Sequence, residues 1–251
     1  MLEVRALSKS FGAIQALSSV SIEVGKGRIH GIIGPNGSGK TTLFNCVTGL
    51  VRADSGSVLL DGREITASRP ETIARRGIRR TFQAGKLVPG LTVLENVMAG
   101  VNDGIAAEAR DAALRLPFVR SRRETEIRER AMKALEMAGM GGVAERWAAD
   151  LVWTERQLVQ IARAMVGEPV LLLLDEPASG MGVREVERVE KLIHDIRQAG
   201  VTVVVVSHDV KMLMNLSDVV TVLNFGQKIA EGPPSEIQRD PRVLEAYLGA
   251  E

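Results

Sequence analysis

The glycine-rich run GPNGSGKT at positions 34–41 places the tightest limit on how this chain can fold. It matches in full the P-loop pattern, in which backbone N–H groups turn inward around phosphate oxygens between a strand and a helix. A predicted strand at 28–33 precedes it, and a helical segment at 40–48 follows, with Gly49 as a suitable helix stop. The pattern predicts strand, phosphate-binding loop and helix in succession. The alternative is a glycine-rich turn that holds no ligand.

Residues of this loop are the predicted contacts of a nucleoside triphosphate. Lys40 is expected to reach the β- and γ-phosphates, and the Thr41 hydroxyl is expected to ligate Mg²⁺. The predicted ATP contacts in the loop and the first turn of the helix are Asn36, Gly37, Ser38, Gly39, Lys40, Thr41 and Thr42.

A second run, VLLLLDE at 170–176, combines a buried strand with two acids at its end. Asp175 is expected to bind Mg²⁺ through water, and Glu176 to orient or deprotonate the attacking water. The alternative is that both acids only cap the next element, with Pro177 starting a turn. The phosphate-binding loop upstream favours the catalytic interpretation.

Hydrophobic patterns predict an α/β fold that contains two kinds of sheet. The continuously apolar runs at 170–174 and 201–206 are typical of central parallel strands covered on both faces. Apolar residues recur at helical spacing between these runs, which completes a strand–helix–strand unit. Alternating patterns at 2–6 and 20–24 indicate instead an antiparallel sheet with one solvated face.

The middle of the chain differs in character from both ends. Residues 85–150 are helix-rich and charged, with expected helices at 106–116 and 124–137 that are separated at Pro117. Short strands return after this segment, and a final short helix is expected at 241–248.

Composition limits the partners and the location of the protein. The chain has 251 residues and a net charge of +1, so it lacks a domain-wide basic field and no nucleic acid partner is expected. Its single cysteine, Cys46, cannot form an internal disulfide, which suits a reducing compartment. No apolar run reaches the roughly 18 residues that span a bilayer, and the first residues lack the apolar region of a signal peptide. Any role at a membrane is therefore expected to be peripheral.

Three further segments narrow the class of P-loop protein. They are TFQ at 81–83, DEP at 175–177 and VSHD at 206–209, the last directly after a predicted strand. Together with the loop they resemble the ABC ATPase family over nearly the whole chain.

The resemblance implies a P-loop NTPase of ABC type with a parallel core sheet, an antiparallel β subdomain and a helical subdomain. It implies one domain at 1–251. The RecA-like core and the β subdomain are expected at about 1–84 and 151–251, and the helical subdomain at about 85–150.

The resemblance also assigns roles outside the loop. Gln83 is implied to link ATP to the helical subdomain and His208 to contact the γ-phosphate, so that both join Glu176 in the predicted catalytic set. Phe11 takes the position of the aromatic residue that stacks on adenine, with Ala16 nearby. The alternatives are a phenylalanine in the core and a strand-end histidine that bonds only to backbone.

The implied metal ligands are Thr41, Gln83 and Asp175. The other two histidines, His30 and His194, have no comparable context, and no functional role is predicted for them.

A finer resemblance is to the ATPase subunits of branched-chain amino acid importers. It rests on RTFQ at 80–83, LTVLENV at 91–97, an extra helical segment at about 102–130, and AYLG at 246–249. The lipopolysaccharide-export ATPases are similar over much of this length, but the extra helical segment favours the importers. The resemblance implies transmembrane permease subunits as partners, a periplasmic or extracellular substrate-binding protein as an indirect partner, and a peripheral position on the cytoplasmic face of the inner membrane. The cargo is expected to depend on the partner subunits.

One segment departs from the family pattern. ABC ATPases bind two ATPs between head-to-tail subunits, and each ATP meets a signature loop of the type Leu-Ser-Gly-Gly-Gln from the opposite subunit. Here the matching segment is LVWTE at 151–155, with Val152 at the serine position and Thr154 at the second glycine. Valine has no donor for the γ-phosphate. Thr154 with Gln157 also predicts a capping box for a helix at 155–166.

The altered signature leaves three interpretations. In the first, which we favour, this chain pairs with a different ATPase whose signature is complete, and the site on its own P-loop hydrolyses ATP. In the second, it forms a homodimer with two weakened sites. In the third, it is a regulatory subunit that binds ATP with little hydrolysis.

Overall fold

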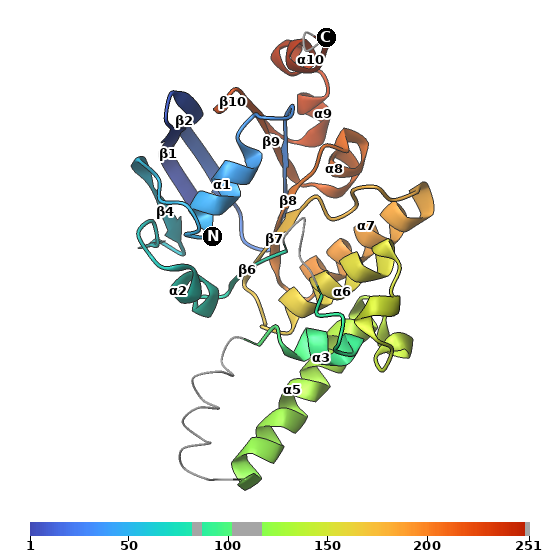
Figure 1. Cartoon of the computed structure of the whole chain (residues 1–251). Helices are drawn as coiled ribbons and strands as arrows, with labels where there is room; N and C mark the ends of the chain where they lie inside the picture. Colours follow the sequence, from blue (N-terminus) through green and yellow to red (C-terminus); the bar gives the residue numbers. More distant parts are fainter. Residues whose placement is uncertain (82–86, 102–116, 249–251) are drawn as a thin grey trace. The chain divides into compact units, whose positions relative to one another are not determined.

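In the computed structural model the described residues are 1–81, 87–101 and 117–248, and the chain divides into two compact units (Figure 1). The first unit comprises Met1–Arg80 and Val170–Glu251, and the second comprises Thr81–Pro169. The second unit is longer than the helical segment predicted at 85–150, because the helix that follows position 150 packs with the other helices of that unit. Gln83 and the helix predicted at 106–116 lie outside the described residues.

The first unit contains a four-stranded antiparallel sheet with the order β2-β1-β4-β5. Leu2 and Val4 of the first strand are buried, as are Ile22 and Val24 of the second, while intervening side chains face solvent. The alternating pattern therefore produces the predicted sheet with one wet face. Its strands are β1 (Leu2–Phe11), β2 (Ile14–Val24), β4 (Ser55–Leu60) and β5 (Arg63–Glu64).

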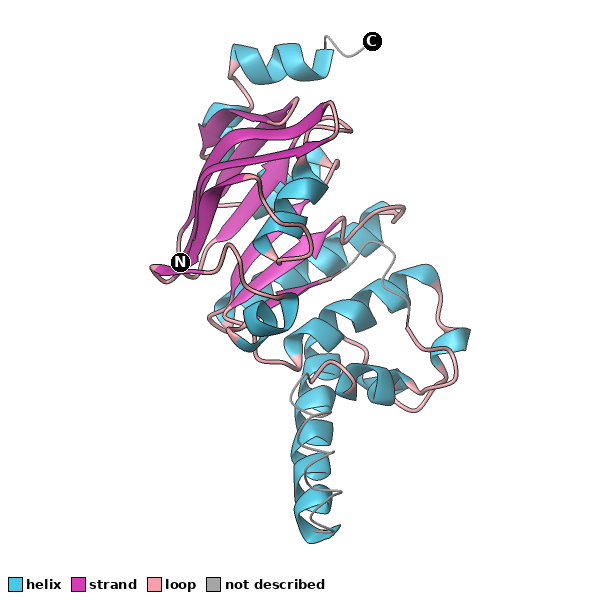
Figure 2. Ribbon diagram, turned by 60° about the vertical axis from the view of Figure 1, so that its left-hand side comes forward, coloured by secondary structure: helices cyan, strands magenta, loops and turns pink. Residues whose placement is uncertain are grey.

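The same unit contains a six-stranded sheet with the order β10-β9-β3-β8-β7-β6. Figure 2 shows the strands of the unit in magenta. All its neighbouring strands are parallel except the edge pair of β9 and β10. Both continuously apolar runs form central strands, as predicted, and every residue of β7 and β8 is buried. The strands are β3 (Ile29–Ile33), β6 (Ile78–Arg80), β7 (Leu171–Asp175), β8 (Thr202–Val206), β9 (Val219–Asn224) and β10 (Gln227–Gly232).

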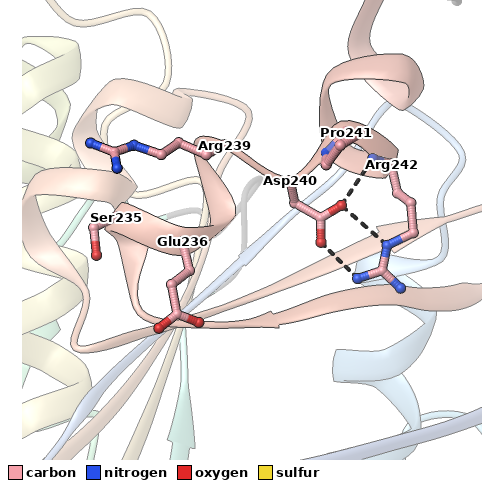
Figure 3. A pocket seen from close by; sticks show the side chains of 6 residues that line it. All are labelled: Ser235, Glu236, Arg239, Asp240, Pro241 and Arg242. Carbon is pink, nitrogen blue, oxygen red and sulfur yellow. Dashed lines mark hydrogen bonds and ion pairs between the residues drawn. The ribbon is translucent and has the colours of Figure 1, made fainter.

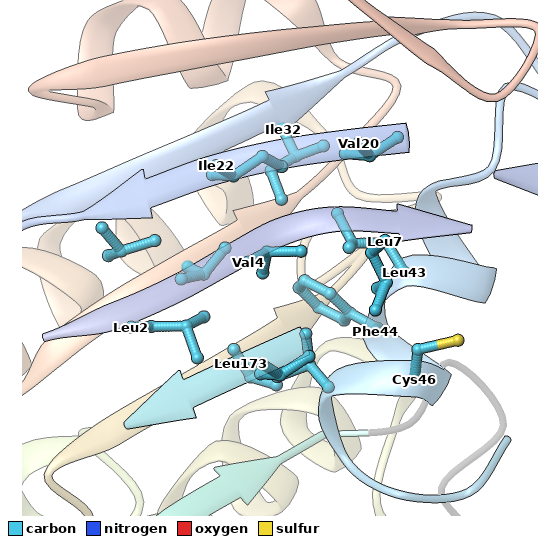
Figure 4. Close-up of a cluster of buried hydrophobic side chains, with 14 of the residues drawn as sticks. Leu2, Val4, Leu7, Val20, Ile22, Ile32, Leu43, Phe44, Cys46 and Leu173 are labelled. Atoms are coloured by element: carbon cyan, nitrogen blue, oxygen red, sulfur yellow. The ribbon is translucent and has the colours of Figure 1, made fainter. Parts of the chain in front are cut away.

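Helix α1 (Lys40–Val47) packs into a hydrophobic cluster to which both sheets contribute (Figure 4). Its Leu43 and Phe44 contact side chains such as Leu7 from β1 and Leu173 from β7 within that cluster. The other helices of this unit are α2 (Pro70–Arg75), α7 (Val183–Gln198), α8 (Val210–Leu216), α9 (Pro234–Ile237) and α10 (Pro241–Leu248). Of these, α7 packs against the core strand β8, and α8 packs against the core strand β3.

The second unit is helical in its described part. It contains α3 (Val93–Met98), α5 (Pro117–Met137) and α6 (Trp153–Met165), which pack on one another. Two short 3₁₀ turns, Gly141–Val143 and Ala148–Asp150, join α5 to α6. Helix α5 begins at Pro117, where the sequence predicted a break, and therefore starts earlier than the helix predicted at 124–137. Within these described residues no helix combines the length and the apolar character that crossing a bilayer requires.

His30 lies in β3, the strand that leads into the glycine-rich loop, and its side chain is buried. Its Nε2 lies 2.8 Å from the Thr221 hydroxyl, which donates in turn to Glu231. Burial lowers the pKa of His30 to about 4, while Glu231 opposes this change and Lys228 adds to it. The ring is therefore neutral in the folded chain at neutral pH.

This burial predicts a pH dependence of stability. Between pH 6.5 and about 4 the unfolded chain binds a proton at His30 that the folded chain does not. The free energy of unfolding should therefore decrease as pH falls through this window, by about 3 kcal/mol in total from this group. Urea denaturation at several pH values should show a flatter profile for His30→Gln than for the wild type. His194→Gln, at a partly exposed histidine, should keep the wild-type profile; an unchanged profile in His30→Gln would contradict the assignment.

Candidate nucleotide site

The glycine-rich loop joins the buried end of β3 to the first turn of α1. Gly34 and Gly39 have φ values of +154° and +104°. A Cβ on Gly34 would lie 2.1 Å from the carbonyl oxygen of Leu223, and one on Gly39 would lie 2.5 Å from that of Ala16. Only glycine can therefore occupy these two positions without moving the backbone around the loop.

The N-terminus of α1 has no side-chain cap, because its N-cap residue is Gly39. The first N–H groups of a helix have no partner within the helix, and they attract anions. Asn36, Gly37 and Thr41 are exposed here, whereas Ser38 and Lys40 are buried. The loop thus offers backbone donors and a hydroxyl to solvent, which suits a polyphosphate.

Lys40 folds back over the loop that precedes it. Its ammonium group donates to the carbonyl oxygens of Gly34 at 2.6 Å and Pro35 at 2.9 Å, and lies 3.4 Å from the Ser38 hydroxyl. Burial lowers the pKa of Lys40, and the carboxylates of Glu176 and Asp175 oppose this change. The lysine charge and the two acids therefore belong to one electrostatic cluster.

Asp175, at the end of β7, forms a buried ion pair with Arg80 at the end of β6. The Arg80 Nη2 lies 2.6 Å from the Asp175 Oδ2, and each side chain is only 5% exposed. The other terminal nitrogen of Arg80 donates to the Asn45 side-chain oxygen at 2.7 Å, and the guanidinium lies 5.3 Å from the centre of the Phe44 ring. Arg80 belongs to the RTFQ motif at 80–83, but no role was predicted for it from the sequence.

Glu176 and His208 contact each other directly. The His208 Nδ1 lies 2.7 Å from the Glu176 Oε2, which is also 3.3 Å from the His208 backbone nitrogen and 3.4 Å from the Ser207 hydroxyl. Glu176 is buried and adopts a φ of +51°, while the His208 side chain is 61% exposed. The histidine thus bonds to a side chain, and not only to backbone as in the alternative interpretation.

Phe11 and Ala16 lie on the hairpin of β1 and β2. The Phe11 side chain is 48% exposed, so it is not a core residue, and the Lys9 ammonium lies 5.4 Å from the centre of its ring. Ala16 contacts the loop through the approach of its carbonyl to Gly39. An exposed aromatic ring on the same hairpin as Ala16 suits stacking of a base.

The signature segment differs from its prediction. Helix α6 begins at Trp153, and the Val152 N–H donates to the Glu155 carboxylate at 3.1 Å. The predicted capping box of Thr154 with Gln157 is therefore wrong, because Thr154 already lies in the first helical turn with its side chain buried. Val152 and Trp153 are 62% and 49% exposed, so they form the outer surface of this helix start.

A residue of the last helix also approaches the loop. The Tyr247 hydroxyl on α10 is buried, and it lies close enough to the Gly34 backbone to interact with it. Burial raises the pKa of Tyr247 to about 12, and the backbone of Gly34 offsets part of this rise. The AYLG segment at 246–249 supported only the family resemblance, so the approach of Tyr247 to Gly34 was not predicted from the sequence.

A separate hollow of about 670 Å³ lies between α9 and α10 (Figure 3). Arg242 donates to Asp240 at 2.6 Å, so these two charges compensate each other. The lining contains two cationic and two anionic side chains, so it has no net positive charge to attract a polyphosphate. None of the predicted site residues belongs to it. It is formed by Ser235, Glu236, Arg239, Asp240, Pro241 and Arg242.

The parallel sheet, the glycine-rich loop before α1 and the acids after β7 define a P-loop ATPase. The ABC transporter family profile matches residues 17–179, and that of the branched-chain amino acid ATP-binding cassette transporters matches 227–251. High-affinity branched-chain amino acid transport ATP-binding proteins from Salmonella typhimurium (LivG) and Pseudomonas aeruginosa (BraF) are each 37% identical over 250 residues, covering 99% of this chain and 98% of the relative. A solved ATP-binding cassette of an ABC transporter in its ADP conformation matches with a TM-score of 0.86 and 32% identity, covering 99% of this chain and 98% of that chain.

The chain therefore belongs to the LivG/BraF family of ABC transporter ATP-binding proteins. This confirms the family predicted from its motifs, the α/β fold of ABC type, and an ATPase activity coupled to transport.

The loop geometry predicts a ranking of glycine substitutions. Gly39→Ala should weaken ATP binding more than Gly37→Ala, because both have positive φ but only Gly39 has a backbone oxygen within 2.5 Å of the added Cβ. The αL strain alone costs roughly 1–2 kcal/mol. Gly62→Ala, in an open turn with a φ of +73°, is the matched control for strain. Calorimetric titration with ATP should give wild-type affinity for Gly62→Ala; equal affinities for all three variants would contradict the ranking.

Proposed function

We propose that this chain hydrolyses ATP at its own P-loop with Glu176 as the general base, and that hydrolysis drives the import of branched-chain amino acids. The observation that carries the proposal is the 2.7 Å contact of Glu176 with His208, in the same electrostatic cluster as Lys40. Glu176 Oε2 already receives the donors of His208 and Ser207. Oε1 is therefore the oxygen proposed to accept the proton of the attacking water.

Each remaining residue is proposed to act on one part of ATP. Phe11 and Ala16 hold the base, while Lys40 leaves its carbonyl partners for the β- and γ-phosphates. His208 then orients the γ-phosphate. The loop donors that bind the phosphates are proposed to be those of Asn36, Gly37, Ser38, Gly39, Thr41 and Thr42.

Mg²⁺ is the proposed metal, with Thr41 and Asp175 as protein ligands and Gln83 as a third by family resemblance. No group of three or more His, Cys, Asp or Glu side chains in the described part of the chain could hold a metal by itself. This donor set suits Mg²⁺, which typically keeps several waters and binds through one or two protein oxygens and the substrate phosphates. When bound, the ion would neutralise charge on the β- and γ-phosphate oxygens.

The transporter context is proposed from the relatives. LivG and BraF are named as branched-chain amino acid transport proteins, and the match at 227–251 favours this cargo over lipopolysaccharide export. The proposed partners are transmembrane permease subunits, a second ATPase subunit, and a substrate-binding protein that acts indirectly. The proposed location is the cytoplasmic face of the membrane.

The exposed signature surface supports pairing with a different ATPase chain. Val152 offers no hydroxyl, while Trp153 and Thr154 occupy the two positions where the family pattern has glycines that allow close approach to phosphate. A second ATP bound against this surface would lack a charge-assisted hydrogen bond worth roughly 1.5–3 kcal/mol. We therefore favour a heterodimer in which the partner supplies the complete signature.

Glu176→Gln should abolish turnover while the chain still binds ATP. Loss of a general base lowers rates by about 100-fold or more, and the amide keeps the size of the side chain. The measurement is ATP hydrolysis in the assembled transporter, with ATP affinity of the isolated chain determined in parallel. Glu187→Gln, on the exposed face of α7, is the matched control and should be as active as the wild type. Turnover at the wild-type rate in Glu176→Gln would exclude Glu176 as the base. Absence of ATP turnover in the wild type would favour a regulatory subunit.

The oligomeric state of the chain in the presence of ATP tests whether its altered signature segment permits a homodimer. In the Glu176→Gln background the chain should remain monomeric with ATP and Mg²⁺, as measured by light scattering after gel filtration. Adding Val152→Ser, Trp153→Gly and Thr154→Gly restores the donor and the close approach, so a dimer should then form. Leu244→Ser, at an exposed position on α10, is the control and should stay monomeric. A dimer without the signature changes would show that the homodimer is competent.

A further inference from the structure

Arg80 contacts two different elements of the nucleotide site with its two terminal nitrogens. One nitrogen donates to Asp175 on β7 at 2.6 Å, and the other donates to Asn45 on α1 at 2.7 Å. The planar guanidinium also lies over the Phe44 ring, which limits its rotation. The side chain is 5% exposed, so solvent does not compete effectively for these bonds.

The partner on α1 lies on the helix face that bears a proposed metal ligand. Asn45 is four residues after Thr41, and residues four apart stand one above the other on a helix. A bond to Asn45 therefore fixes the rotation of the helix face from which Thr41 projects. The bond to Asp175 fixes the carboxylate at the end of β7.

We propose that Arg80 is a positioning residue for the metal, because its guanidinium holds the α1 face of Thr41 and the carboxylate of Asp175 at a fixed separation. The inference rests on the proposed role of these two residues as Mg²⁺ ligands. Side chains that orient metal ligands from behind typically contribute 10–100-fold to metal affinity. Lysine cannot replace Arg80, because its single ammonium lacks the rigid fork that reaches both partners.

Arg80→Lys should therefore lower metal-dependent nucleotide binding selectively. Calorimetry would compare the affinity of the purified chain for a non-hydrolysable ATP analogue in Mg²⁺ with its affinity in EDTA. The ratio of the two affinities reports what the metal adds to binding. It should fall by about tenfold in Arg80→Lys, while the affinity in EDTA stays at the wild-type value.

A second variant guards against misfolding of the first. Asn45→Ala removes one arm of the contact, keeps the ion pair, and introduces a good helix former. It should lower the same ratio, by less than Arg80→Lys does. Arg197→Lys is the matched control, because Arg197 also bridges an aspartate, Asp218, and a backbone carbonyl, that of Gly27, within the same unit.

Asp175→Asn separates failure of this inference from failure of the proposed function. If Asp175→Asn leaves the ratio unchanged, Asp175 is not a metal ligand and the proposed function is wrong on that point. If it lowers the ratio while Arg80→Lys and Asn45→Ala keep the wild-type value, Arg80 does not position the ligands. A lower melting temperature in Arg80→Lys with an unchanged ratio would likewise show a purely structural role and overturn the inference.

Discussion

The packing of α1 between the two sheets of the first unit is the interaction on which the site depends. A helix of eight residues is too short to be stable alone, so its conformation depends on burial of Leu43, Phe44 and Val47. Because the cluster includes side chains from both sheets, the helix is restrained on two sides. The direction of its N-terminus, and hence of the phosphate-binding loop, follows from that restraint.

Parallel strand order then places the remaining groups. The carboxyl ends of β3, β6, β7 and β8 meet at one edge of the core sheet, as is general where ligands bind to open α/β sheets. Gly34 follows β3, Arg80 ends β6, Asp175 ends β7 and His208 comes shortly after β8. One topological rule therefore gathers residues that are far apart in the chain.

Features with a local signature were predictable from the sequence. The P-loop, the buried parallel strands and the helix that ends at Met137 depend on short-range patterns, and the structure contains all three. The Arg80 contacts were not predictable, because its partners lie 35 and 95 residues away and no local pattern marks such pairs. The start of α6 was misplaced because Thr154 and Glu155 both suit a first turn, and burial of the Thr154 side chain decided the register. The approach of Tyr247 to Gly34 depends on where α10 packs, which its amphipathic pattern alone does not specify.

The uncapped start of α1 has a consequence for the stability of the whole fold. Its N–H groups lack a cap from Gly39, so a bound phosphate group would complete hydrogen bonding that the polypeptide leaves unfinished. A ligand that binds only the folded state adds about 2.7 kcal/mol of stability at a concentration 100 times its dissociation constant. The nucleotide is thus both substrate and a component of the native structure. In a cell rich in ATP, the working stability of this subunit is in part a property of its ligand.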